Sequence, residues 1–209
     1  MNEDQHELAK SSRVDLQIIA DWITPGSRVL DVGCGDGVLL DYLTHFKQVD
    51  GRGIELSMEG VRNCVSAGLS VIQGDAARDL HDFPDAAFDY VVLSQTLQAM
   101  QQPRVVLEEM LRIGRHAVVS FPNFGHWRVR LYLGLHGRMP VSDNLPFQWY
   151  ETPNIHFCTI RDFVELCHDM NISVEKSRSL DHNGDARGVN ERLGLANMFG
   201  QQGVFLLKR

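Results

Sequence analysis

Apolar residues repeat along this chain at two spacings, one typical of amphipathic helices and one typical of buried strands. From Arg13 to Ile23 they recur every three or four positions, and Pro25-Gly26 ends the segment, which predicts an N-terminal helix. Short uncharged apolar runs bounded by turn residues then predict strands with both faces covered. The predicted strands are residues 28–32, 49–55, 70–73, 88–93 and 117–121, and the predicted helices between them are 38–45, 58–67 and 104–113.

Regular alternation of strand and helix is typical of a parallel sheet. Later in the chain, Thr159 and Asp162 form a capping-box pattern that predicts the start of a further helix. Residues 172–180 and 203–208 are expected to close the sheet as an edge hairpin, with Gly184, Gly188 and Gly194 in the polar connection between them. The sequence therefore predicts one α/β domain over residues 1–209, built on a doubly wound, mostly parallel, seven-stranded sheet.

Residues 121–158 interrupt the alternation. Residues 121–160 hold eight of the 17 Phe, Trp and Tyr residues of the chain and four of its seven prolines. Such a stretch is neither a plain crossover helix nor a flexible linker. We expect it to be an insertion after the fifth strand that acts as a lid or as a docking surface.

Composition narrows the class of function. The chain has 209 residues and a formal charge of −7, the wrong sign for holding nucleic acid by phosphate neutralisation. The four cysteines contain no C-x-x-C pair, and the acidic N-terminus lacks a signal sequence, so a cytoplasmic protein with reduced thiols is expected. No apolar run is long enough to span a membrane, and the histidine and cysteine spacings predict no metal site.

The densest chemistry is the run VLDVGCGDG at residues 29–37, where a strand leads through three glycines into a helix. Its G-x-G-x-G spacing departs from the G-x-G-x-x-G fingerprint of dinucleotide sites, so NAD is disfavoured. Asp31 would repel a diphosphate but suits a ligand that carries an ammonium group. The pattern therefore favours a nucleotide that bears an amino acid.

This run resembles the first motif of class I S-adenosylmethionine (SAM)-dependent methyltransferases. The resemblance implies that Glu55 accepts hydrogen bonds from the ribose hydroxyls, and that Asp75 and the Ala76 backbone recognise adenine. Taken singly, Glu55 and Asp75 also suit helix caps or solvated loop acids, but together with the glycines they favour SAM or S-adenosylhomocysteine (SAH). The cofactor-binding residues implied by the resemblance are Asp31, Gly33, Cys34, Gly35, Gly37, Glu55, Leu56, Asp75, Ala76 and Ser94.

Any methyl acceptor is expected beyond the carboxyl ends of the fourth and fifth strands, which read SQTLQ at 94–98 and SFPN at 120–123. Neither is the N-P-P-Y or Pro-Cys signature of nucleic-acid base methylation. Gln95 and Asn123 could position an acceptor or simply cap the strand ends. His126 is a candidate for acid–base work, with a surface or stacking role as the favoured alternative. No catalytic residue is assigned.

Longer segments of the chain, GIE at 53–55, VIQGD at 71–75, FDYVVLSQTLQ at 88–98 and SFPNFGHW at 120–127, resemble the MetW family of methionine biosynthesis proteins. The resemblance implies a partnership with MetX, the homoserine O-acyltransferase. Two hypotheses follow. In one, the chain binds SAM or SAH as an accessory subunit, with Trp127 and Trp149 as docking anchors and Arg128 and Arg130 aiding orientation. In the other, it is a SAM-dependent methyltransferase of a small molecule, and the insertion is a lid.

Overall fold

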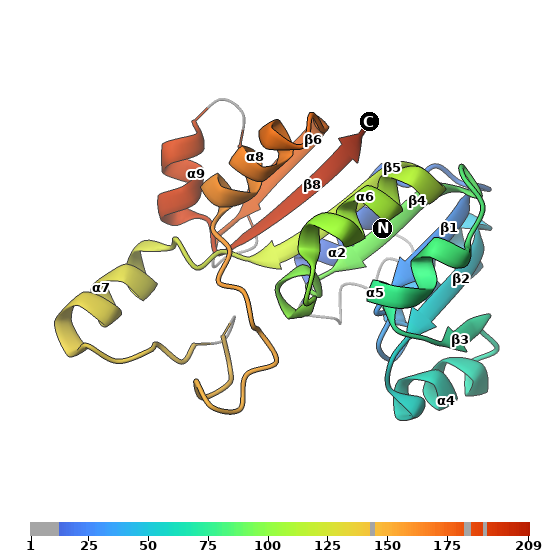
Figure 1. Ribbon diagram of the computed structural model, residues 1–209, viewed down its shortest axis with the longest axis horizontal. Coiled ribbons are helices and arrows are strands. Elements are labelled where there is room, and N and C mark those ends of the chain that lie inside the picture. The colour runs from blue at the N-terminus through green and yellow to red at the C-terminus, as the bar shows by residue number, and fades with distance from the viewer. Residues whose placement is uncertain (1–12, 143–144, 182–184, 190–191) are drawn as a thin grey trace.

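The computed structural model describes residues 13–142, 145–181, 185–189 and 192–209. Its centre is an eight-stranded sheet in the order β3-β2-β1-β4-β5-β8-β6-β7 (Figure 1). The strands are β1 (Arg28–Val32), β2 (Asp50–Glu55), β3 (Val71–Gln73), β4 (Phe88–Ser94), β5 (Gly114–Pro122), β6 (Ser173–Leu180), β7 (Ala186–Gly188) and β8 (Gln202–Lys208). The helices are α2 (Val14–Trp22), α3 (Val38–Lys47), α4 (Met58–Ser66), α5 (Ala76–Asp79), α6 (Pro103–Ile113), α7 (Trp127–His136), α8 (Ile160–Asp169) and α9 (Leu193–Phe199), with short 3₁₀ turns η1 (Leu80–Asp82) and η2 (Leu97–Ala99).

Parallel pairing joins β3, β2, β1, β4 and β5, and β8 runs antiparallel between β5 and β6. The predicted doubly wound, mostly parallel sheet is confirmed, including the antiparallel pairing of its last two predicted strands. The predicted number of strands is one too low. The extra strand, β7, pairs antiparallel with the end of β6. Its three residues are all exposed, so no hydrophobic pattern marks them.

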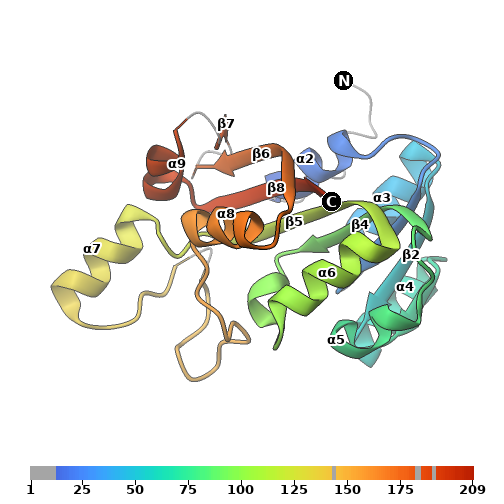
Figure 2. The same ribbon diagram turned by 45° about the horizontal axis from the view of Figure 1, so that its top comes forward.

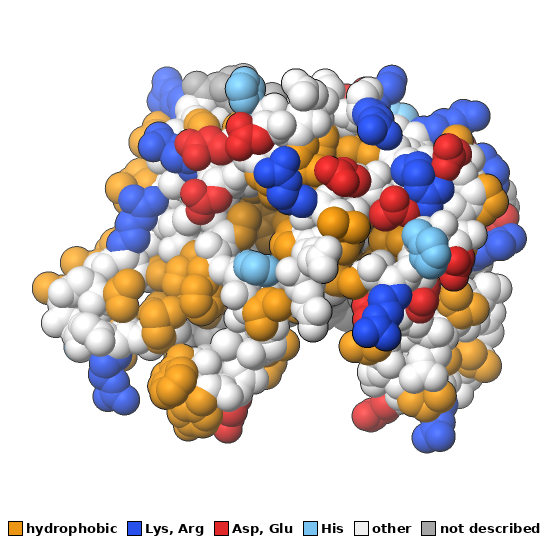
Figure 3. Space-filling view, in the orientation of Figure 1, with side chains coloured by type: hydrophobic (Ala, Val, Ile, Leu, Met, Phe, Trp, Pro, Cys, Tyr) orange, Lys and Arg blue, Asp and Glu red, His pale blue; other side chains and the backbone are white. Residues whose placement is uncertain are grey.

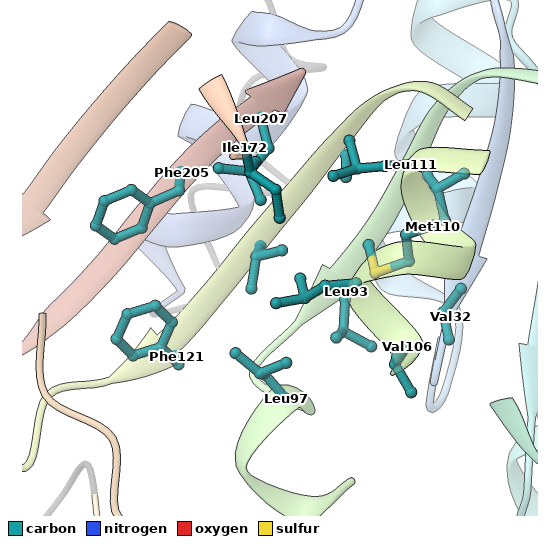
Figure 4. Packing of buried hydrophobic residues seen from close by; sticks show 14 of the residues in the cluster. Val32, Leu93, Leu97, Val106, Met110, Leu111, Phe121, Ile172, Phe205 and Leu207 are labelled. Carbon is teal, nitrogen blue, oxygen red and sulfur yellow. The ribbon is translucent and has the colours of Figure 1, made fainter. Parts of the chain in front are cut away.

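The core has two halves because successive side chains of a strand point to opposite faces of the sheet. In β4, Val91 and Leu93 pack with α6 and α8, whereas Val92 packs with α2 and α3. Figure 2 shows α6 and α8 together on one side of the sheet. Figure 4 shows Val106 and Met110 of α6 directed toward Leu93. Helices on both faces explain why the strands read as uncharged apolar runs.

Three phenylalanine rings close the core beneath α8. Phe163 of this helix lies 4.8 Å from the Phe121 ring of β5 and 4.7 Å from the Phe205 ring of β8, centroid to centroid. The predicted capping box starts this helix, since Thr159 and Asp162 each accept from the other's backbone N–H. The long connection predicted after residue 180 differs from expectation, because it also contains α9, whose Leu195 and Phe199 remain about half exposed.

The insertion after β5 consists of α7 and a mostly non-helical segment that returns to α8. In Figures 1 and 2, α7 projects away from the sheet. Val129 is the buried residue of this ten-residue helix. The sequence did not predict α7 as a helix, because its apolar residues surround the axis and leave no amphipathic stripe.

Candidate functional site

The glycine turn lies directly after β1, at the carboxyl edge of the sheet. Gly33, Gly35 and Gly37 have φ angles of 70°, 59° and 83°, a region that residues with a side chain rarely adopt. A Cβ at Gly33 would lie 3.0 Å from Cγ2 of Thr96, so this turn packs tightly against the end of β4. No atom lies within 4 Å of a Cβ built at Gly35, so this position faces open space. The turn is therefore backed by protein on one side and accessible on the other.

Glu55, at the end of β2, holds the glycine turn in place. One oxygen of its carboxylate accepts from the Gly35 N–H at 2.8 Å, and the other accepts from the Ser57 N–H at 2.7 Å. Each carboxylate oxygen has capacity for a further hydrogen bond. The geometry thus leaves Glu55 able to accept from a vicinal diol beside Gly35.

Asp31 is the buried acid of the site. Loss of hydration on burial raises its pKa from about 3.8 to about 7, nearby Arg13 opposes that rise, and the Glu55 charge adds to it. Its side chain accepts no hydrogen bond from any of the described residues. A ligand ammonium group at this position would supply the missing positive charge.

The remaining predicted cofactor residues lie on the same edge. Asp75 caps α5 by accepting from the Ala77 N–H at 3.0 Å, and Ala76 is buried in the first turn of that helix. The helix-cap alternative for Asp75 is thus realised, and its half-exposed side chain still leaves an oxygen available. Leu56 follows Glu55 with 68% of its surface exposed, as a side chain that packs on a flat ring would be.

The Cys34 side chain is buried and packs in a small cluster with Leu40, Cys64 and Leu69. Burial raises the pKa of both the Cys34 and Cys64 thiols, and the Cys64 thiol donates to the Gly35 carbonyl at 3.4 Å. Buried thiols of this kind are unreactive packing residues. Cys34 therefore offers a ligand its backbone rather than its sulfur.

A buried polar cluster at the ends of β4 and β5 was not predicted. The Asp15 side chain is fully buried and accepts from Arg13 at 2.8 Å, from Ser120 at 3.1 Å and from Ser94 and Gln95 at 3.3 Å. Four donors satisfy a carboxylate that would otherwise be costly to bury. Ser94, one of the predicted cofactor residues, is thus also a structural link between β4 and α2.

Asn123 and His126, two candidates for work on a methyl acceptor, both make hydrogen bonds within the fold. Both polar atoms of the Asn123 side chain are used internally, with Nδ2 donating to the Asn197 and Gly200 carbonyls and Oδ1 accepting from two backbone N–H groups. Asn123 therefore ties the end of β5 to α8 and α9. His126 is buried and caps α7, with Nδ1 accepting from the Arg128 N–H.

A cavity of about 670 Å³ lies away from the glycine turn, between α7, the end of β6 and α9. It is lined by aromatic and aliphatic side chains and by charged groups of both signs, among them Trp127, Arg128, Asp181, Arg187, Arg192 and Phe199. It shares no residue with the predicted cofactor set. Its position beside His126 places it next to the carboxyl end of β5.

Neither a metal-binding cluster nor a membrane-spanning helix is found among the described residues. They contain no group of three or more His, Cys, Asp or Glu side chains that could hold a metal ion. They also form no helix with the length and apolar character needed to cross a membrane.

A family model described as methionine biosynthesis protein MetW matches residues 13–207. The chain belongs to the MetW family. This placement confirms the resemblance found in the sequence, and the family spans both the glycine turn and the insertion.

Curated relatives share parts of this chain. The bifunctional methionine biosynthesis protein MetXA/MetW of Rhodopirellula baltica is 38% identical over 172 residues, which are 78% of this chain and 28% of that protein. A fatty-acid O-methyltransferase of Mycolicibacterium smegmatis is 38% identical over 95 residues, 43% of this chain and 34% of that enzyme. The chain thus spans about a third or less of the length of these two relatives.

Solved structures confirm the fold. A SAM-dependent methyltransferase from Mesorhizobium loti has a TM-score of 0.69 at 15% identity and covers 95% of this chain and 99% of its own. A SAM-dependent methyltransferase from Archaeoglobus fulgidus has a TM-score of 0.67 at 16% identity, with 97% and 94% covered. The chain therefore has the class I methyltransferase fold.

Proposed function

We propose that this protein binds SAM or SAH and acts as an accessory or regulatory subunit of homoserine O-acyltransferase, MetX. The observation that carries the proposal is the relative in which a MetW region and MetXA form one bifunctional protein. Two functions joined in one chain act at a fixed stoichiometry and close together. Separate chains of the same families would need an interface to achieve this.

The glycine turn supports the ligand half of the proposal. An open Gly35, the Glu55 carboxylate and the buried Asp31 carboxyl meet at one edge of the sheet. A diol on Glu55 and an ammonium on Asp31 would match the two ends of SAM or SAH. A diphosphate would instead face two carboxyl groups, which disfavours NAD.

A second candidate is SAM-dependent methyl transfer to a small molecule. The cavity next to the end of β5 supports a small-molecule ligand, because its volume suits one and its lining mixes aromatic, aliphatic and charged groups, but it shares no residue with the predicted cofactor set. Methyl transfer requires an acceptor atom in line with the sulfonium methyl group. The accessory role is preferred because no acid–base pair is assigned at the end of β4 or β5.

Two measurements test the proposal. Calorimetry with SAM, SAH and NAD should give saturable binding of an adenosyl ligand and none of NAD. Co-purification with MetX, followed by acyl-transfer assays with and without this chain, should reveal a complex and a change in acyl-transfer rate. Binding of NAD alone would refute the ligand half, and an unchanged rate with no complex would refute the partner half.

A further inference from the structure

The insertion carries large apolar side chains that remain well exposed in the described chain. In α7, Leu131, Tyr132, Leu133 and Leu135 are 41–71% exposed. An isolated helix of ten residues is marginal in water, and most helices are stabilised by packing an apolar face. This helix packs mainly through Val129. It therefore resembles a helix whose packing partner lies outside this chain.

The returning segment extends the same surface. Trp149 and Tyr150 are 71% and 65% exposed and meet edge to face with ring centroids 5.5 Å apart. Phe147, Ile155 and Phe157 are each about half exposed. We call residues 127–142 and 145–158 the arm, and Figure 3 shows hydrophobic side chains gathered over it. Clustered exposed aromatics of this kind mark protein interaction sites.

The C-terminal end of the arm is anchored to the body of the protein. The Gln98 carbonyl, in η2 after β4, accepts from the Ile155 and His156 N–H groups, both at 3.0 Å. Near α8, the Phe124 and Phe157 rings lie 4.4 Å apart, centroid to centroid. Anchoring of this kind lowers the entropy lost when a partner binds, because the surface is already ordered.

Charge on the arm indicates what kind of protein would cover it. Among the described arm residues, Arg128, Arg130 and Arg138 are exposed cations and Glu151 is the single acid, although the whole chain has a charge of −7. Two copies packed arm to arm would bring the same arginines together, since a two-fold interface is self-complementary. The arm instead fits a different protein whose apolar patch has an acidic rim.

We propose that the arm is the docking face for the acyltransferase, with Trp149 and Tyr150 as apolar anchors and Arg138 contacting an acidic rim. This inference rests on the proposed partnership with MetX. Trp127, the other anchor predicted from sequence, is 38% exposed and lies at the base of α7 beside the cavity. The sequence also allows both tryptophans to fill the protein's own core, but both side chains are exposed, so this alternative is wrong.

The test compares arm variants with matched variants elsewhere on the surface. The double variant Trp149→Ala/Tyr150→Ala is compared with Phe46→Ala, an exposed aromatic on α3, and Arg138→Glu with Arg62→Glu on α4. Affinity for purified MetX is measured together with thermal melting, SAH affinity and sedimentation of this chain alone. The arm variants should melt and bind SAH like the parent because their side chains are exposed.

We expect the double variant to lose at least about thirtyfold in affinity for MetX. Arg138→Glu should lose several-fold, with a larger loss at low salt, and both controls should bind like the parent. Full-strength binding by a folded double variant would overturn the docking face while leaving the partnership intact. Failure of the parent chain to bind MetX would instead overturn the partnership. A loss of self-association in the arm variants would assign the face to a second copy of this chain.

Discussion

Asp31 is the residue at which burial and charge conflict most strongly. Its folded-state pKa of about 7 lies above the unfolded value, so folding favours the protonated carboxyl. Any stability from this preference is complete below about pH 4 and is lost as the pH rises through about 7. The site is thus destabilised at neutral pH unless a cation approaches, and a ligand ammonium group would relieve this.

Binding of SAH should therefore depend on pH through Asp31. An ammonium favours the ionised carboxylate, so below pH 7 binding must release a proton, and the Kd should rise by up to about tenfold for each pH unit below 7. Calorimetry between pH 5.5 and 8.5 would measure this slope. Asp31→Asn should bind more weakly and lose most of the pH dependence. The same slope in both proteins would show that another group titrates.

Glu55 supports the glycine turn in addition to its proposed contact with the ligand, and its place in the sequence does not reveal the first role. Because its carboxylate accepts from Gly35 and Ser57, Glu55→Ala would remove both the proposed diol contact and the support of the glycine turn. We expect SAH to bind about 10- to 100-fold more weakly, or about 1.5–3 kcal/mol. Glu59→Ala, on the exposed face of α4, is the control and should bind like the parent. An unchanged Kd in folded Glu55→Ala would make Glu55 a turn-supporting residue only.

At the scale of single elements, the N-cap of α8 fixes the point at which the arm ends and the regular fold resumes. Thr159 caps this helix immediately after the arm ends, and its hydroxyl accepts from the Asp162 N–H at 3.1 Å. Thr159→Ala should lower the free energy of unfolding by about 1 kcal/mol, measured by denaturant titration. Thr159→Ser retains the hydroxyl and should stay close to the parent. Equal losses in both variants would point to the methyl group instead of the cap.

Elements with a clear hydrophobic period could be predicted from the sequence, and those without one could not. β4 was predicted because burial on both faces demands an uncharged apolar run. β7 was missed because Ala186–Gly188 is exposed and pairs with β6 through its backbone, so its side chains follow no hydrophobic pattern. The helix α7 was missed because its apolar side chains face solvent in several directions, a pattern suited to a partner and not to its own core.

At the scale of the whole molecule, the parts of the candidate site marked by a local sequence motif could be predicted, and the parts that join distant segments could not. The glycine turn was predicted from its local G-x-G-x-G spacing and Glu55 from the resemblance to class I methyltransferases, and the parallel sheet brings both to one edge because the ends of its strands lie there. The cluster around Asp15 joins residues up to 105 positions apart, and no local pattern relates Asp15 to Ser120. An acid in the first turn of a helix usually remains solvated, so its complete burial could be recognised only in three dimensions.

The two hydrogen bonds on the Gln98 carbonyl link the arm to the ligand edge through one short turn. Thr96 precedes that turn and packs on Gly33, so a ligand bound at the glycine turn would lie next to the segment whose far end holds the arm. Deuterium exchange can read this link, since an amide exchanges only when its hydrogen bond opens. SAH should slow exchange at the Ile155 and His156 amides while leaving the amides of α8 unchanged. The surface that meets the partner would then become more rigid as the adenosyl ligand accumulates, whereas unchanged exchange would mean that the two regions act independently.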